Sequence, residues 1–375
     1  MQNTINPYIA GSPVRDKEMY FGRAHVFETV KRCLIDASPS QIVVLHGQRR
    51  MGKTSTLYQM TYHLPETYIP VLVDLQGLSL DGLPELLWDI SQVIRRQLRR
   101  AAEVSLERAD RETWLADAQG NIQRFFETVG REIGQRHIVL MIDETMLLAD
   151  KVAAGTLDDQ VFSALGALMS RLPYLDFCFS IGSKAGLMKD EIDSLPRAAT
   201  SIEIGFLEPD AARALIQEPA KGLVQYGAEA IETILRLTAG QPYYTQLICH
   251  ELFDHAQSTG QLIITAADVE TIRPGVVEMA TAQLHYVWDE TPSLGQQVLL
   301  ALAEIEAQGK NAGTAGQIGR LLLHHGIMAH NAEIDRELQA LYNRKILYGQ
   351  KQYNFSIDLF RNWVLQHQRL EWVEK

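Results

Sequence analysis

Short apolar runs that lack alternating polar positions mark the first half of the chain. Runs of this kind are typical of strands buried on both faces, as in a parallel sheet covered by helices. They lie at residues 41–45, 69–73, 138–142 and 177–181, and a weaker run follows at 201–204. Helical patterns long enough for crossover connections separate them, for example at 83–98 and 122–133. We therefore predict a doubly wound α/β domain.

The pattern changes after Leu207, where the strand-like runs stop. Pro209 is placed to open a helix, and a later helix is interrupted at Gly240-Gln241-Pro242. The last hundred residues read as three helices at 294–305, 316–325 and 332–342, a hairpin at 346–355 and a final helix. That order predicts a winged helix. The expected domains are a core at 1–205, a helical lid at 206–272 and a winged helix at 273–375.

Composition and charge narrow the class of protein. The chain has 375 residues, 46% of them hydrophobic and 22% charged, and its net charge is −11. An acidic chain is a poor candidate for a protein whose main task is to grip phosphate backbones. The three cysteines are isolated within apolar stretches, and the N-terminus lacks the basic and apolar regions of a secretory signal. We expect a soluble cytoplasmic protein without a membrane span.

A phosphate-binding motif follows the first strand. The segment G-x-x-x-x-G-K-[ST] is the Walker A pattern, in which backbone N–H groups and a helix N-terminus face the phosphates of a nucleotide. Lys53 would add a positive charge to the phosphate oxygens, and the Thr54 hydroxyl would bind Mg²⁺. The predicted ATP-binding residues of this loop are Gly47, Gln48, Arg49, Arg50, Met51, Gly52, Lys53, Thr54 and Ser55.

The third apolar run supplies the matching acidic half. It ends in Asp143 at the carboxyl edge of the predicted sheet, where ligands of open α/β sheets bind. Asp143 would hold Mg²⁺, and Glu144 would align and deprotonate the water that attacks the γ-phosphate. Lys53 and Glu144 are thus the predicted catalytic residues. The alternative is that Glu144 only tunes the site as a second acid beside the metal ligand.

The fourth apolar run ends near Ser183 and Lys184. A polar or cationic side chain at this position would sense the γ-phosphate. The alternative is an ordinary turn after a strand with a solvated lysine.

Together these segments resemble the bacterial AAA-like or STAND-type ATPases (signal-transduction ATPases with numerous domains) and the related archaeal-type and origin-recognition-like ATPases. The resemblance rests on Phe21-Gly22-Arg23, the Walker A loop, Asp143-Glu144 and Gly240-Gln241-Pro242, and it spans nearly the whole chain. It implies an AAA-like (ASCE) P-loop core with a lid and a winged helix, slow ATP hydrolysis with Mg²⁺, and nucleotide-controlled assembly.

The resemblance also assigns residues outside the Walker motifs. Gly22 and Arg23 would line the adenine and ribose side, and Pro242 would pack on the nucleotide and report its state. The strand before Ser183 would lie between the Walker A and Walker B strands.

Two features depart from the family pattern. Ala24 replaces the acidic residue that usually follows Phe-Gly-Arg, and Phe355-Ser356-Ile357-Asp358 stands in place of a Met-His-Asp triad. The family's ADP-locked off state does not carry over on these residues. We expect signalling to pass to a separate protein partner or effector, or through a nucleotide-dependent homo-oligomer.

Several arginines allow more than one interpretation. Arg95, Arg96, Arg99 and Arg100 form one stripe on a helix, which is either a docking face for an acidic partner or nucleic acid, or a solvated surface. Arg197 stands where an arginine finger could reach a neighbouring subunit.

The winged helix raises the alternative of a DNA-associated regulator or loader. Its third helix carries Glu333, Asp335 and Glu337 against Arg336 and Arg344. Acidic side chains on a groove-reading face oppose the approach of phosphates. The sequence therefore favours an ATP-dependent switch over DNA binding, and also over a module that holds nucleotide without turnover.

Overall fold

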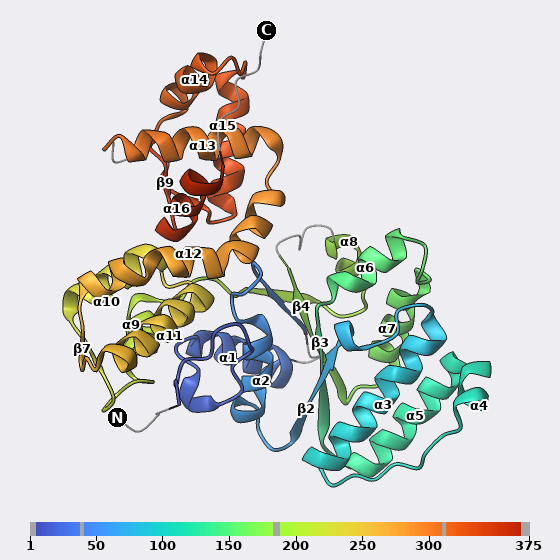
Figure 1. Cartoon of the computed structure of the whole chain (residues 1–375). Coiled ribbons are helices and arrows are strands. Elements are labelled where there is room, and N and C mark those ends of the chain that lie inside the picture. Colours follow the sequence, from blue (N-terminus) through green and yellow to red (C-terminus); the bar gives the residue numbers. More distant parts are fainter. Residues whose placement is uncertain (1–4, 38–40, 183–187, 310–312, 369–375) are drawn as a thin grey trace. The chain divides into compact units, whose positions relative to one another are not determined.

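The computed structural model describes residues 5–37, 41–182, 188–309 and 313–368, which divide into two compact units. One unit is Pro13–Gly205, and the other combines Met1–Ser12 with Phe206–Lys375. Figure 1 shows both units with their elements labelled. In the described residues, no helix combines the length and the apolar character needed to cross a bilayer.

The first unit contains a five-stranded parallel sheet in the order β2-β3-β4-β1-β5. The strands are β1 (Ile42–His46), β2 (Tyr68–Asp74), β3 (His137–Asp143), β4 (Leu175–Ile181) and β5 (Ala199–Glu203). The register pairs Val43 of β1 with Cys178 of β4, and Met141 of β3 with the same Cys178. The expected parallel sheet is confirmed, and β4 lies between the strands that precede the Walker A loop and end in Asp143.

Helices cover both faces of this sheet, with α3, α5 and α7 on one side and α1 and α2 on the other (Figure 1). The apolar runs of the inner strands β1, β3 and β4 are continuous because alternate side chains enter opposite layers that are both buried, whereas the edge strands β2 and β5 are buried mainly on one face. The helices are α1 (Ala24–Lys31), α2 (Lys53–His63), α3 (Leu83–Ala101), α4 (Arg111–Ala116), α5 (Ala118–Ile133), α6 (Met146–Ala153), α7 (Gln160–Arg171) and α8 (Lys189–Asp193).

The second unit is mainly helical. It begins with α9 (Pro209–Gln217), α10 (Ala228–Thr238), α11 (Pro242–Thr259) and α12 (Ala266–Asp289), with a short parallel pair β6 (Gln225–Tyr226) and β7 (Ile263–Ile264). It continues with α13 (Ser293–Ala307), α14 (Ala315–His324), α15 (Asn331–Asn343), the antiparallel hairpin β8 (Leu347–Tyr348) and β9 (Asn354–Phe355), and α16 (Asp358–His367). This is the predicted winged-helix order of helices and hairpin.

The two units and the three expected domains differ in two places. Residues 5–12 belong with the helical unit, because the buried Tyr8 ring packs edge-on against Tyr226 and Phe253 at centroid distances of 6.5 and 6.4 Å. The expected boundary between residues 272 and 273 falls inside α12, which continues through Pro274 to Asp289. One hydrophobic cluster extends from α9–α12 into α13–α16.

The turn between α10 and α11 is fixed by a close backbone approach. Gly240 has φ = 72°, and its carbonyl oxygen accepts a hydrogen bond of 3.0 Å from the Leu207 N–H. A Cβ at this position would lie 2.9 Å from the Leu207 carbonyl oxygen and 3.3 Å from the Ala212 Cβ. Only glycine satisfies both the left-handed backbone and this contact.

We predict that Gly240→Ala lowers the free energy of unfolding by about 2–4 kcal/mol, the sum of left-handed strain and the clash with Leu207. Gly222→Ala is the matched control, because Gly222 has φ = 81° but open space around it; it should cost about 1 kcal/mol. Urea unfolding of the full chain measures both. Equal losses in the two variants would contradict the assigned clash.

Candidate functional site

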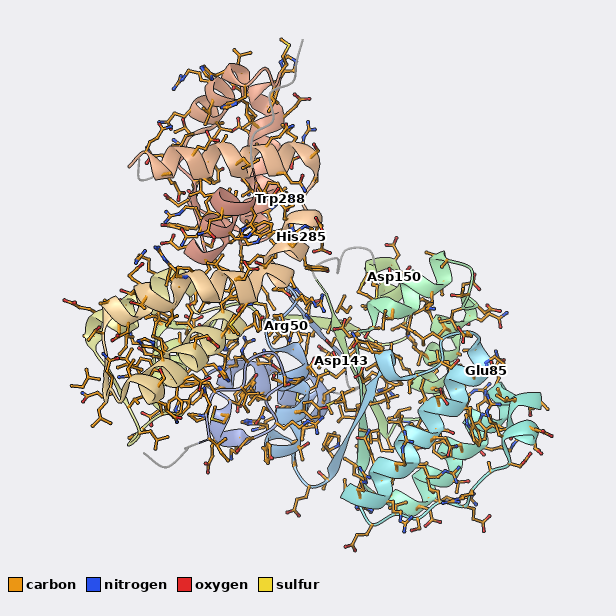
Figure 2. The ribbon with its side chains drawn as sticks, in the orientation of Figure 1. Arg50, Glu85, Asp143, Asp150, His285 and Trp288 are labelled. Atoms are coloured by element: carbon orange, nitrogen blue, oxygen red, sulfur yellow. The ribbon has the colours of Figure 1, made fainter. Side chains whose placement is uncertain are left out.

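The Walker A loop connects β1 to α2 at the carboxyl edge of the sheet (Figure 2, where Arg50 and Asp143 are labelled). Gly47 begins the loop against residue Ile204, just beyond β5. A Cβ on Gly47 would lie 2.3 Å from the Ile204 carbonyl oxygen, so a larger residue would push the loop away from the strand. Arg50 has φ = 66°, which turns the loop sharply before α2 begins at Lys53.

Lys53 is held inside this loop. Its side chain is 8% exposed, and its Nζ donates hydrogen bonds to the carbonyl oxygens of Gly47 and Gln48, both at 3.0 Å. Burial lowers the pKa of the Lys53 ammonium, and the carboxylates of Glu144 and Asp143 oppose that shift. The charge therefore sits at the point where the loop N–H groups would receive phosphates.

Asp143 ends β3 and reaches the start of α2. Its Oδ2 accepts a hydrogen bond of 2.7 Å from the Thr54 hydroxyl, and its Oδ1 accepts one of 3.1 Å from the Glu144 N–H. Asp143 is 3% exposed. A carboxylate and a hydroxyl oxygen thus meet beside the phosphate loop, and oxygen donors of this kind fit Mg²⁺.

Glu144 follows Asp143 in a left-handed conformation with φ = 54°. This backbone conformation is costly for a residue with a side chain, and such outliers concentrate at functional sites. Burial raises the pKa of the Glu144 carboxyl and Asp143 raises it further, whereas Lys53 and Arg49 lower it. A half-buried carboxyl with a raised pKa is the kind of group that could act as a general base.

Arg23, which follows Gly22, contacts the loop through its side chain. Arg23 Nη2 donates to the Met51 carbonyl oxygen at 2.7 Å and to the Gly205 carbonyl oxygen at 2.9 Å. Burial lowers the pKa of the Arg23 guanidinium. The sequence pointed to Arg23 but did not reveal that its partners are main-chain carbonyls.

Ser55 and Gln59 on α2 are hydrogen-bonded to the segment that precedes η1 (Lys17–Met19). The Ser55 hydroxyl accepts a hydrogen bond of 3.0 Å from the Val14 N–H. The buried Gln59 amide donates to the Arg15 carbonyl oxygen at 3.1 Å. In this structure Ser55 holds residue 14, and its assignment to the nucleotide stays a prediction.

Three predicted residues cannot be joined to this constellation. Ser183 and Lys184 lie outside the described residues. Pro242 belongs to the helical unit, where it opens α11 directly after the N-cap residue Gln241. The Gln241 side chain accepts a hydrogen bond of 2.8 Å from the Tyr244 N–H, which fixes the start of the helix.

Arg197 is not free to act as an arginine finger. Its guanidinium donates to the carbonyl oxygens of Leu175, Met169 and Leu172 at 2.8, 2.9 and 3.2 Å, and lies 3.4 Å from the Asp176 carboxylate. These partners lie at the start of β4 and the end of α7, at the opposite edge of the sheet from the Walker A loop. The expectation of a projecting arginine is therefore wrong.

The arginine stripe of α3 is shorter than expected. Arg95 packs over the Phe125 ring at 5.6 Å and donates to the Leu106 carbonyl oxygen at 3.3 Å, and burial lowers its pKa. The exposed members are Arg96, Arg99 and Arg100. Their positive charges lie in the last turns of α3, where they interact favourably with the negative end of the helix dipole.

Ser180 is a polar residue of the site that sequence reasoning missed. It is fully buried in β4, its carbonyl oxygen accepts from the Thr145 N–H at 3.0 Å, and its hydroxyl has no partner among the described residues. The signal was a polar residue two positions after Cys178 on the same face of an apolar strand.

Comparison with known proteins identifies the fold. No protein-family model matches the sequence, and no curated protein sequence matches it. The structure is similar to the Walker-type ATPase PABY2304 of Pyrococcus abyssi, with a TM-score of 0.68, 16% identity, and 95% of this chain and 99% of that chain covered. It is also similar to the ORC2 protein of Aeropyrum pernix, solved with ADPNP and ADP, with a TM-score of 0.58, 12% identity, and 98% and 97% covered. The chain has an AAA-like P-loop ATPase fold with a C-terminal winged helix.

We predict that Lys53→Ala weakens ATP binding by about 10- to 100-fold, because it removes a charge-assisted contact to the phosphates. Lys31→Ala is the control, since Lys31 lies on the surface of the same unit and forms an ion pair with Glu28 at 3.4 Å. Titration with a fluorescent ATP analogue in Mg²⁺ measures both. If Lys53→Ala bound ATP as tightly as the parent, the assignment of the Walker A loop to the nucleotide would be wrong.

Proposed function

We propose that this protein binds ATP with Mg²⁺, hydrolyses it slowly, and uses its nucleotide state to control assembly with a partner protein or with itself. The observation that carries the proposal is the 2.7 Å hydrogen bond between Thr54 and Asp143 beside the buried Lys53 ammonium. It joins two segments far apart in the sequence, whose residues would bind the phosphates and Mg²⁺.

The residues of the site would divide the reaction among them. Lys53 would exchange its bonds to the loop carbonyls for the β- and γ-phosphate oxygens of ATP, and the loop N–H groups would complete the cradle. Thr54 and Asp143 would hold Mg²⁺, which supplies neutralising charge on the phosphates. Glu144 would orient a water molecule in line with the γ-phosphate and accept its proton.

The acidic residues of α15 and the hydrogen-bonded side chain of Arg344 support a switch over a DNA-bound regulator. Arg344 would be a cation of a DNA-reading face, but it donates to the Thr291 hydroxyl at 3.0 Å and to the carbonyl oxygens of Glu290 and Val287 at 3.4 Å. The Arg344 guanidinium is therefore already hydrogen-bonded at the end of α12. On α15, Arg336 lies among acidic residues, which oppose the approach of DNA phosphates.

Glu144→Gln should keep ATP affinity within about threefold and lose about 100-fold or more of hydrolysis, because an amide fills the same space but cannot accept a proton. Glu132→Gln changes an exposed carboxylate of α5 in the same way and should leave turnover unchanged. Phosphate release with saturating Mg²⁺ and ATP gives the rates. Equal turnover of parent and Glu144→Gln would make Glu144 a bystander, and no turnover in either would favour binding without hydrolysis.

The switch itself predicts a difference between nucleotide states. Small-angle scattering and sedimentation of the protein with ADP, and of Glu144→Gln with ATP, should give different profiles. Pro242→Ala should reduce that difference more than it weakens nucleotide binding, because proline fixes φ at the start of α11. Typical coupling of about 1–3 kcal/mol is enough for a several-fold change in populations.

The control for the switch is Pro209→Ala, which changes the equivalent first-turn proline of α9. It should keep the full difference between ADP and ATP. If the parent with ADP and Glu144→Gln with ATP, both with Pro242 intact, gave identical profiles, the protein would be an ATPase without a switch.

A further inference from the structure

Arg23 has an unusual combination of backbone and side-chain environment. It is a left-handed residue with φ = 65°, directly after the left-handed Gly22 with φ = 74°. Its guanidinium is desolvated enough to lower its pKa, yet no carboxylate of the described residues lies within ion-pair distance. A strained backbone and a buried charge without a counter-ion are both unfavourable. The groups that the Arg23 side chain contacts therefore have to offset these costs.

The contacts of Arg23 join the Walker A loop to the end of its unit. One nitrogen, Nη2, donates to the Met51 carbonyl oxygen, two residues before Lys53, and to the Gly205 carbonyl oxygen. Gly205 is the last residue of the unit Pro13–Gly205. A displacement of the loop backbone at Met51 therefore acts on the same guanidinium that holds Gly205.

The backbone before Gly205 is tied to the loop as well. The Ile204 N–H donates to the His46 carbonyl oxygen at 2.7 Å, and the Ile204 carbonyl oxygen blocks any side chain at Gly47. Gly47 thus lies against Ile204, and Met51 is joined to Gly205 through the Arg23 guanidinium that both carbonyl oxygens share.

The other side of this connection is held within the helical unit. After Phe206, the Leu207 N–H donates to the Gly240 carbonyl oxygen at 3.0 Å. Gly240 stands two residues before Pro242 in the turn that opens α11. Residues 205–207, which we name the coupling link, are therefore fixed at one end by Arg23 and at the other end by Gly240.

We propose that Arg23 is a positioning residue that transmits the state of the Walker A loop to the coupling link. The proposal rests on the function proposed above, because it needs a nucleotide in the loop. Phosphate binding would fix the loop backbone at Met51, Arg23 would carry that order to Gly205, and the covalent chain would carry it to Leu207 and the turn at Gly240. A brace with no such role would stabilise the fold equally with and without nucleotide.

Hydrogen exchange of the Phe206 and Leu207 amides, measured with and without saturating Mg²⁺-ADP, tests this role. In the parent, nucleotide should slow exchange of these amides by about fivefold or more. Arg23→Ala, at a nucleotide concentration that saturates it, should lose most of this nucleotide-dependent protection. Arg23→Lys should keep only part of it, because the lysine ammonium lies one bond closer to its Cα than Arg23 Nη2 does and so falls short of the two carbonyl oxygens.

A matched control and a rescue separate coupling from general stability. Arg15→Ala removes an arginine that contacts α2 through Tyr58, at 3.0 Å to its hydroxyl, but does not contact the loop; it should show parent-like protection. Millimolar methylguanidinium added to Arg23→Ala should restore protection of the link in the presence of nucleotide.

The outcomes distinguish the two proposals. Parent-like nucleotide-dependent protection of the link in Arg23→Ala, with nucleotide bound, would overturn the positioning role and leave the ATPase function standing. If Arg23→Ala does not fold, Arg23→Lys decides in the same way. A parent that binds no nucleotide at all would instead overturn the proposed function.

Discussion

The hydrogen bond from the Thr54 hydroxyl to Asp143 depends on the order of the strands. Thr54 follows β1 and Asp143 ends β3, and β4 lies between these two strands in the sheet. The two residues meet only because α2 begins directly after the loop and turns its first hydroxyl across the edge of β4. The same carboxylate also accepts from the Glu144 N–H, and Lys53 directly precedes Thr54 at the start of α2.

Burial gives the site its electrostatic character. Burial lowers the pKa of the Lys53 ammonium and raises the pKa of the Glu144 carboxyl, and the opposite charge of each residue opposes the shift of the other.

Several arginines in this acidic protein turn inward to main-chain carbonyls. Arg197 binds carbonyls at the end of α7, Arg344 binds those at the end of α12, and Arg23 binds those of the Walker A loop and Gly205. Carbonyls at helix ends lack intrahelical partners, and a guanidinium can satisfy two or more of them at once. These side chains therefore hold the ends of segments together.

The sequence by itself determined the parallel α/β core, the Walker A loop, the Asp143-Glu144 pair and the helix and hairpin order of the winged helix. These features are local, because continuous apolar runs, glycine spacing and proline positions constrain a few neighbouring residues. Only the tertiary structure decided that Tyr8 packs with the helical unit, that α12 continues through Pro274, and that Arg197 and Arg23 serve carbonyls far away in the sequence. Those choices depend on which distant backbone groups lie within reach of a long side chain, and a linear pattern of residue types does not contain that distance.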